Sequence, residues 1–195
     1  MWVFLYHPHL LISTWVFDMN FNVEESELEG VLLIQPAIYS DPRGRFFESF
    51  QKERYKEIGI KEEFVQDNQS VSLKNTIRGL HYRASPEQAK LVRAIKGEVF
   101  DVVVDIRSQS PTFGQWRGYT LSDSNYRQIY IPVGFAHGFC VLSETAEFLY
   151  KVSEYYSAEK EKGIMWNDRD IGIKWPTSKP ILSEKDKTNP ALKDI

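Results

Sequence analysis

Cysteine is almost absent from this sequence, since Cys140 is the only one among 195 residues. A single cysteine excludes an internal disulfide framework and is consistent with a reducing compartment, so we expect a cytoplasmic protein. Basic blocks are also missing, and the formal net charge is −3, which argues against a protein that binds nucleic acid. The sequence has no internal repeat and no low-complexity tract. Its length is compatible with a single domain that has its own core.

Charged residues are missing from the first 17 positions, which contain no Lys, Arg, Asp or Glu. A signal peptide needs a basic start and small residues before a cleavage site, and neither is present. The segment is short for a membrane span and contains Pro8 and two histidines. We therefore expect residues 1–18 to be an atypical, non-native extension translated from upstream sequence, with the natural start at Met19. A targeting segment or an added strand is the alternative. Residues 19–195 are expected to form one domain, with no membrane association.

Long amphipathic helices are also scarce, and short β-rich segments separated by turn signals dominate the chain from Glu29 onward. One helix is expected, at about 51–57. The expected strands cover 30–34, 46–50, 64–66, 90–95, 98–106, 118–121, 128–131, 138–142 and 146–152. Many short strands with little helix predict a β-sandwich or barrel.

The segment 131–139 contains the pattern Ile-Pro-x-Gly-x-x-His. Pro132 cannot donate to a sheet ladder and Gly134 permits a sharp turn, so the strand should end there and present His137 from a turn. The pattern resembles the second motif of the cupins, small β-barrels whose lumen holds a metal or a small molecule.

Histidines are too few for the metal-binding version of that fold. Its first motif carries a His-x-His pair and a glutamate, because a divalent cation needs several converging N and O ligands. The corresponding segment here is 78–83, in which His81 is followed by Arg83 at the second histidine position. His7 and His9 lie far away in the N-terminal extension. We therefore expect no metal and a pocket with metal-free chemistry.

Strand alternation places ionisable side chains on faces that are otherwise apolar. Asp101 and Asp105 share one face of 98–106, where acids need partners. Lys90 shares its face with apolar residues, which is unusual for an ammonium group unless it pairs or serves a ligand. Tyr150 lies on the apolar face of its own strand. The structural alternatives are ion pairs for Lys90 and the aspartates and a core position for the tyrosine.

Ordered motifs along the chain closely resemble those of the dTDP-4-dehydrorhamnose 3,5-epimerases. The match runs from about Gly30 to Leu192, in the segments 41–44, 46–49, 64–68, 78–81, 90–93, 97–107, 110–114, 131–139, 146–151 and 182–186. The resemblance implies a mainly β, cupin-like jelly-roll barrel or sandwich with a few short helices. It implies an isomerase that converts dTDP-4-dehydro-6-deoxy-D-glucose into dTDP-4-dehydro-L-rhamnose without a cofactor, in the biosynthesis of dTDP-L-rhamnose for cell-surface polysaccharide.

The same resemblance implies catalytic roles. His81 looks like the base that removes the protons next to the 4-ketone, at carbons 3 and 5. The family aspartate that orients this base falls on Asp186, with Asp101 as the alternative on a barrel strand. Lys90 resembles the cation that stabilises the enolate oxygen. Tyr150 matches the family acid on the opposite side of the sugar ring, at least for carbon 5.

The remaining matching positions suit a nucleotide diphosphate, with surface charges as the alternative reading. Arg78 and Arg43 can fork onto phosphate oxygens. The other expected substrate-binding residues are Glu48, Gln66, Asp67, Asn68, Lys90, His137, Tyr156, Glu161 and Lys185. The family also implies a homodimer that shares sheet edges, in which Arg43 and Glu48 would serve the neighbour's pocket.

The sequence departs from the usual family pattern near the expected pocket mouth. Ala89 replaces a glycine before Lys90, Arg45 replaces an aromatic residue, and Val133 replaces a glutamate. These changes leave two alternatives open besides the 3,5-epimerase. One is an epimerase of carbon 3 alone, and the other is a non-catalytic nucleotide-sugar binding barrel. Nucleotide preference is also left open.

Overall fold

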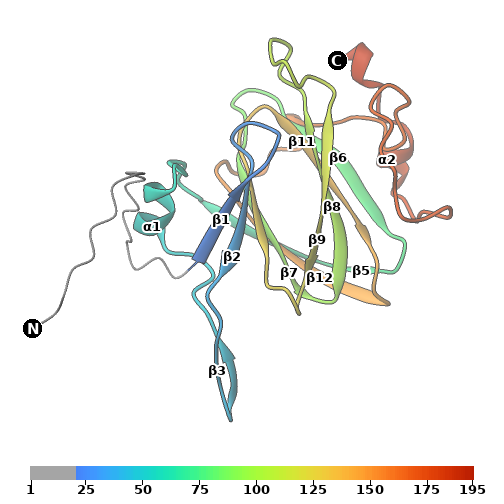
Figure 1. Cartoon of the computed structure of the whole chain (residues 1–195). Coiled ribbons are helices and arrows are strands. Elements are labelled where there is room, and N and C mark those ends of the chain that lie inside the picture. The colour runs from blue at the N-terminus through green and yellow to red at the C-terminus, as the bar shows by residue number, and fades with distance from the viewer. Residues whose placement is uncertain (1–20) are drawn as a thin grey trace, which may run out of the picture.

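Two antiparallel β-sheets packed face to face make up most of the computed structural model, which describes residues 21–195 (Figure 1). The six-stranded sheet has the order β1 (Phe21–Glu25), β2 (Leu32–Pro36), β10 (Gln128–Ile131), β7 (Lys90–Lys96), β12 (Thr145–Val152) and β5 (Gln66–Leu73). The five-stranded sheet has the order β13 (Glu161–Gly163), β6 (Ile77–Arg83), β11 (Phe135–Val141), β8 (Glu98–Asp105) and β9 (Trp116–Ser122). The prediction of a mainly β, cupin-like jelly-roll sandwich is confirmed.

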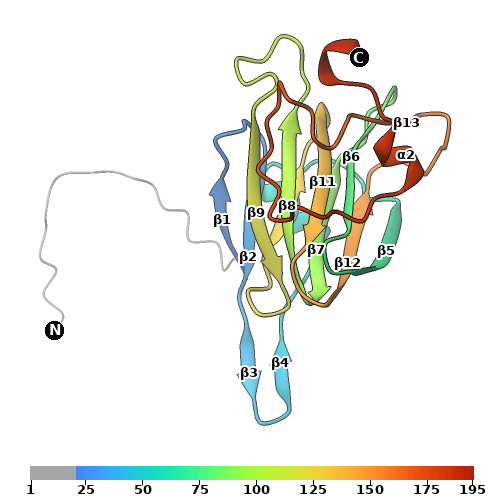
Figure 2. The same cartoon turned by 90° about the vertical axis from the view of Figure 1, so that its right-hand side faces the viewer.

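Three small elements and a hairpin complete the fold. They are α1 (Lys52–Glu57), α2 (Glu184–Lys187), a 3-10 turn at Leu192–Asp194, and the two-stranded hairpin of β3 (Tyr39–Asp41) and β4 (Gly44–Phe46). The hairpin projects away from both sheets (Figures 1 and 2). No helix within residues 21–195 is long and apolar enough to cross a membrane. The predicted extension over 1–18 lies outside the described residues.

Most predicted strands are present, and the exceptions have physical explanations. The strand predicted at 128–131 matches β10, and the predicted helix at 51–57 matches α1, where the side chain of Gln51 accepts a hydrogen bond from the Arg54 N–H. The strand predicted at 46–50 is wrong beyond Phe46. Strands β5 and β6 were largely missed because their inward positions carry polar residues or glycine, which removes the hydrophobic alternation.

His137 does not lie in a turn, which corrects the prediction. The turn forms at 132–134 as expected, but β11 begins at Phe135 and carries His137 as its third residue. The turn carries the chain from β10 in the six-stranded sheet to β11 in the five-stranded sheet. Strand β11 pairs antiparallel with β8 from its first residue, and His137 lies opposite Val103. The histidine is therefore held by a central strand rather than by a loop.

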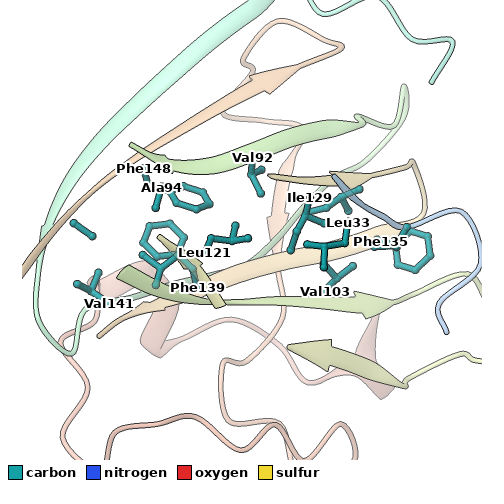
Figure 3. Packing of buried hydrophobic residues seen from close by; sticks show 14 of the residues in the cluster. Leu33, Val92, Ala94, Val103, Leu121, Ile129, Phe135, Phe139, Val141 and Phe148 are labelled. Carbon is teal, nitrogen blue, oxygen red and sulfur yellow. The ribbon is translucent and has the colours of Figure 1, made fainter. Parts of the chain in front are cut away.

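Three apolar clusters hold the layers together. The cluster between the two sheets contains Val92, Val103, Leu121, Ile129 and other residues from both inner faces (Figure 3). A second cluster covers the outer face of the six-stranded sheet with Tyr55 of α1. A third lies on the outer face of the five-stranded sheet, where the C-terminal segment crosses the strands (Figure 2). The five-stranded sheet and the β1–β2–β10–β7 part of the six-stranded sheet are therefore covered on their outer faces, whereas Val71 and Leu73 of β5 are exposed.

Strands β6 and β11 approach each other unusually closely at a pair of glycines. Gly79 has a φ of +130°, and a Cβ added there would lie 2.5 Å from the Cα of Gly138. The pairing register shifts between His137 and Phe139 at the same place, while His81 stays directly opposite His137. The two glycines therefore let neighbouring strands bring both histidines to one location.

We expect Gly79→Ala to destabilise the protein by about 2–4 kcal/mol, because it combines backbone strain with steric overlap. Gly44→Ala is the matched control, since Gly44 also has a φ of +130° but has no atom within 4 Å of its added Cβ. The control should cost only about 1–2 kcal/mol. Urea unfolding of both variants measures the difference, and equal losses would contradict a steric role for the Gly79–Gly138 contact.

Candidate functional site

A cavity of about 230 Å³ lies between the two sheets, next to the apolar cluster. Its lining comprises Gln66, Asn68, Ser70, Arg78, His81, Gln88, Lys90, His137, Phe139, Phe148, Tyr150, Tyr156 and Glu161. The rings of Phe139 and Phe148 stack with centroids 4.3 Å apart and belong both to the cavity wall and to the core. The cavity therefore has a rigid apolar base and a polar lining, which suits a polar organic ligand.

The predicted catalytic side chains come from both sheets. His81 and His137 are cross-strand neighbours on β6 and β11 of the five-stranded sheet. Lys90 and Tyr150 belong to the adjacent strands β7 and β12 of the six-stranded sheet. All four line the same cavity. A ligand between the sheets would thus meet histidines on one side and an ammonium and a phenol on the other.

His81 is oriented by a residue that is remote in the sequence. Its Nε2 lies 2.7 Å from Oδ1 of Asp186, which is buried on the short helix α2. Burial alone would raise the pKa of Asp186, but the hydrogen bond and charge of His81 outweigh it, and the pKa lies below its usual range. Donation from Nε2–H to this carboxylate leaves Nδ1 as the basic nitrogen. His81 and Asp186 therefore have the geometry that the resemblance implies for a histidine base and its orienting carboxylate.

Asp101 forms a second pair of this kind. Its Oδ2 lies 2.8 Å from Nε2 of His137, and both side chains are buried. Burial lowers the pKa of His137 against the opposing effect of the Asp101 charge. The other carboxylate oxygen, Oδ1, is buried without a hydrogen-bond partner among the described residues. Since Asp101 is occupied by His137, the partner of His81 in this structure is Asp186.

Lys90 lies on the inward face of β7, as strand alternation predicts. Burial lowers the pKa of its ammonium group to about 8, although the negative charges of Glu161 and Asp101 oppose this effect. At neutral pH most of the population is still protonated. The site therefore holds a poorly solvated cation, which interacts strongly with any negative charge that develops nearby.

Tyr150 is partly buried beside Phe148, with ring centroids 6.3 Å apart. Burial raises the pKa of its hydroxyl, and the charge of Glu161 acts in the same direction. The phenol is therefore protonated at neutral pH. Such a group can donate a proton to a carbanion or a hydrogen bond to an oxyanion.

The nucleotide-binding residues predicted on β5 point to opposite faces of the sheet, because successive residues of a strand alternate in direction. Gln66 and Asn68 point into the cavity, and the side-chain amide of Gln66 donates to Oδ1 of Asn68 at 2.7 Å. The side-chain oxygen of Gln66, Oε1, accepts a hydrogen bond from the backbone N–H of Tyr156. Asp67 points to the opposite face, where its carboxylate binds Lys151 at 3.0 Å. The structure therefore does not bring the Asp67 side chain to the cavity.

Three other predicted residues, Lys185, Glu48 and Arg43, are not part of the cavity lining. Lys185 binds Glu161 at 3.0 Å and lines a groove that adjoins the cavity at Arg78 and His81. Glu48 forms an ion pair with Arg54. Arg43 pairs with Asp41 on the projecting β3–β4 hairpin. Within one chain, neither Glu48 nor Arg43 reaches the cavity.

Four cavity residues were missed from the sequence: Ser70, Gln88, Phe139 and Phe148. Ser70 could have been found, because it follows Gln66 and Asn68 at the same strand parity.

Asp105 has a structural role, as the alternative reading of the sequence expected. Its carboxylate accepts hydrogen bonds from Arg107, Ser110 and Thr112 of the following loop. Within residues 21–195, no three His, Cys, Asp or Glu side chains converge in a way that could hold a metal ion.

Comparison with known proteins places these features in a family. A family model described as dTDP-4-dehydrorhamnose 3,5-epimerase matches residues 25–194. The chain is 54% identical to the dTDP-4-dehydrorhamnose 3,5-epimerase of Shigella flexneri over 85% of this chain and 92% of that protein. A dTDP-4-dehydrorhamnose 3-epimerase of Streptomyces niveus is 42% identical over 82% of this chain and 78% of that protein.

A solved structure resembles the whole arrangement. It is the dTDP-6-deoxy-D-glucose-3,5-epimerase of Legionella pneumophila in complex with dTDP-4-keto-L-rhamnose. The TM-score is 0.87 at 50% sequence identity, covering 89% of this chain and 93% of that chain. The similarity therefore extends over most of both chains.

The pKa of Lys90 provides a direct test of the cavity electrostatics. We expect its ammonium group to titrate near pH 8, and we expect Glu161→Gln to lower that pKa further, because a nearby negative charge favours the protonated form. NMR of protein with nitrogen-15-labelled lysine side chains measures the titration. Glu184→Gln is the control, since Glu184 pairs with Lys187 at the surface. A Lys90 pKa at the ordinary value of lysine would contradict the prediction.

Proposed function

The chain belongs to the dTDP-4-dehydrorhamnose 3,5-epimerase family, and we propose that it inverts carbons 3 and 5 of dTDP-4-dehydro-6-deoxy-D-glucose. The product is dTDP-4-dehydro-L-rhamnose, an intermediate in dTDP-L-rhamnose biosynthesis. The observation that carries this proposal is the position of a base and a proton donor on opposite walls of one cavity. Inversion needs that geometry, because a proton must leave one face of the ring and return to the other.

His81 is the proposed base. Carbons 3 and 5 flank the 4-ketone, so removal of either proton leaves an enolate whose charge is delocalised onto the ketone oxygen. Nδ1 of His81 accepts the proton, and the Asp186 carboxylate stabilises the imidazolium that forms. His137, held by Asp101, lies beside this base and contributes to the shape and polarity of the same wall.

Lys90 is the proposed cation for the enolate oxygen. Its ammonium group is protonated before the reaction and is poorly solvated, so it gains most when negative charge develops on the oxygen of carbon 4. Tyr150 then supplies a proton from the opposite side of the ring, at least at carbon 5. The proton transfers assigned here, from carbons 3 and 5 to His81 and from Tyr150 to carbon 5, use groups of the chain itself, and the proposed scheme includes no cofactor.

The dTDP portion is proposed to lie along β5 and β6. Arg78 binds phosphate oxygens, Gln66 and Asn68 contact the nucleoside, and Tyr156 stacks on the base. Tyr156 is 64% exposed at the cavity mouth, which leaves its ring accessible to a planar ligand. Lys185 and Glu161 lie at the adjoining rim.

A homodimer is the proposed assembly. The β3–β4 hairpin projects from the sheets and exposes 54% of Tyr39 and 73% of Phe46 (Figure 2). Exposed aromatic residues on a projecting arm are suited to an interface. We propose that this arm delivers Arg43 to the cavity of the partner subunit, with Glu48 near its base.

We also propose a cytoplasmic location, which the single buried Cys140 supports.

Incorporation of solvent deuterium into the sugar distinguishes the 3,5-epimerase from an epimerase of carbon 3 alone. We expect deuterium to enter carbons 3 and 5 of dTDP-4-dehydro-6-deoxy-D-glucose when the protein acts in heavy water, with inversion at both centres. Proton NMR of the sugar follows each carbon separately. Exchange at carbon 3 alone would instead indicate the activity named for the Streptomyces niveus relative. Binding without exchange would indicate a non-catalytic protein.

Substitutions by asparagine test the two histidine–carboxylate pairs. His81→Asn should lower kcat/KM by about 10²-fold or more, because it removes the general base. Asp186→Asn should act mainly on kcat, since an amide cannot stabilise the imidazolium. Asp101→Asn is the comparison variant and should change KM more than kcat, because its partner His137 shapes the cavity wall. A larger loss of kcat in Asp101→Asn than in Asp186→Asn would reverse the assignment of the orienting carboxylate.

Mixed dimers test the proposed role of the hairpin. Arg43→Ala and His81→Asn should each abolish most activity in homodimers. In a mixed dimer, the Arg43→Ala subunit keeps its own His81 and receives an intact Arg43 from its partner, so one cavity should regain activity. Co-expression with two affinity tags isolates this species for assay. No recovery in the purified mixed dimer would show that Arg43 does not act across the interface.

A further inference from the structure

Four polar side chains of β5 point inward, and two of them were not assigned above. Gln66 and Asn68 are bonded to each other, and Gln66 also accepts from Tyr156. Ser70 and Ser72 continue the same inward row. Ser72 is buried, and its hydroxyl oxygen accepts a hydrogen bond of 3.0 Å from Nε of Arg78. The hydroxyl of Ser70 is buried without a partner among residues 21–195.

Ser70 and Arg78 converge on one part of the cavity. Ser70 lies opposite Phe148 in the pairing of β5 with β12, and Arg78 lies opposite Phe139 in the pairing of β6 with β11. Since the two phenylalanine rings stack at 4.3 Å, the serine and the arginine stand over the same aromatic base from different sheets. Both side chains line the cavity.

The hydrogen-bond donors of Arg78 and Ser70 that are unpaired within residues 21–195 suit an anionic ligand in this part of the cavity. The bond to Ser72 fixes Nε of Arg78, while the terminal guanidinium nitrogens have no partner within the part of the chain that the structure describes. The Ser70 hydroxyl has no acceptor among the described residues, and a buried hydroxyl of this kind is costly unless a ligand supplies one. A phosphate oxygen accepts from a guanidinium and from a hydroxyl at the same time.

We propose that Ser70 and Ser72 belong to a diphosphate-binding site built on Arg78. Ser72 is a positioning residue that fixes the orientation of the guanidinium group. Ser70 contacts the ligand directly and donates its hydroxyl proton in a hydrogen bond to the phosphate group that Arg78 holds. This assignment rests on the proposed function, because it requires a nucleoside diphosphate in the cavity.

The direct contact is tested with ligands that differ in phosphate content. Ser70→Ala should weaken binding of dTDP by about tenfold, as expected for a hydrogen bond to a charged group, and leave thymidine binding unchanged. Titration calorimetry measures dTDP, and ligand-observed NMR measures thymidine. Gln69→Ala is the matched control on the opposite face of the same strand, where Gln69 binds Glu147. An unchanged affinity for dTDP, or an equal loss for thymidine, would overturn the role of Ser70.

The positioning role of Ser72 is tested by its dependence on Arg78. Ser72→Ala should raise KM and weaken dTDP binding several-fold with little change in kcat, and Ser72→Thr should restore binding because it keeps the hydroxyl. In an Arg78→Lys background, which lacks Nε–H, Ser72→Ala should have less than a twofold effect. Equal losses in both backgrounds would mean that Ser72 acts independently of Arg78, which would overturn this role.

The outcome for the unmodified protein separates this inference from the function on which it rests. If wild-type protein binds dTDP and catalyses exchange while both alanine variants bind dTDP normally, the serine assignment alone fails. If wild-type protein does not bind dTDP, the proposed function fails and this inference fails with it. Far-ultraviolet circular dichroism and thermal unfolding of each variant confirm that the compared proteins are folded.

Discussion

The stacked contact between Phe139 and Phe148 is the interaction on which the rest of the site depends. It joins a strand of each sheet with ring centroids 4.3 Å apart and closes the apolar core at the point where the cavity begins. Beyond it, the inner faces carry polar groups instead of aliphatic ones. The histidines on one wall and the lysine and tyrosine on the other are therefore held at a separation that the core packing determines.

Ionisable groups are tolerated in such an interior for two reasons. Some are paired with a specific partner, and one has a shifted pKa, so that it is less often charged than it would be in water. Asp186 and Asp101 each bind a histidine, at 2.7 and 2.8 Å. Lys90 has no such direct partner among residues 21–195, and burial lowers the pKa of its ammonium group to about 8. Its charge is thus available to a developing enolate, which is the one group in the proposed reaction that requires it. The burial that lowers the pKa of Lys90 is also what strengthens its interaction with the enolate in the proposed reaction.

The C-terminal segment connects stability with chemistry. It covers the outer face of the five-stranded sheet with Ile164, Ile171 and Leu192, and it carries Asp186 to His81 across 105 residues of sequence (Figure 2). The side chain of Ser183 accepts from the Asp186 N–H and defines the start of α2. The C-terminal segment therefore completes the outer layer and also orients His81, the proposed base.

Strand alternation alone determined that Lys90 and Tyr150 face inward, and the ordered motifs determined the family, because both are local properties of the sequence. The sequence left β5 and β6 largely unrecognised, since a strand whose inward residues are polar lacks the hydrophobic alternation that marks a strand. Only the tertiary structure decided that Asp186 serves His81 while Asp101 serves His137, and that Arg43 lies outside its own cavity. These are contacts between distant segments, and their distances depend on how the two sheets pack.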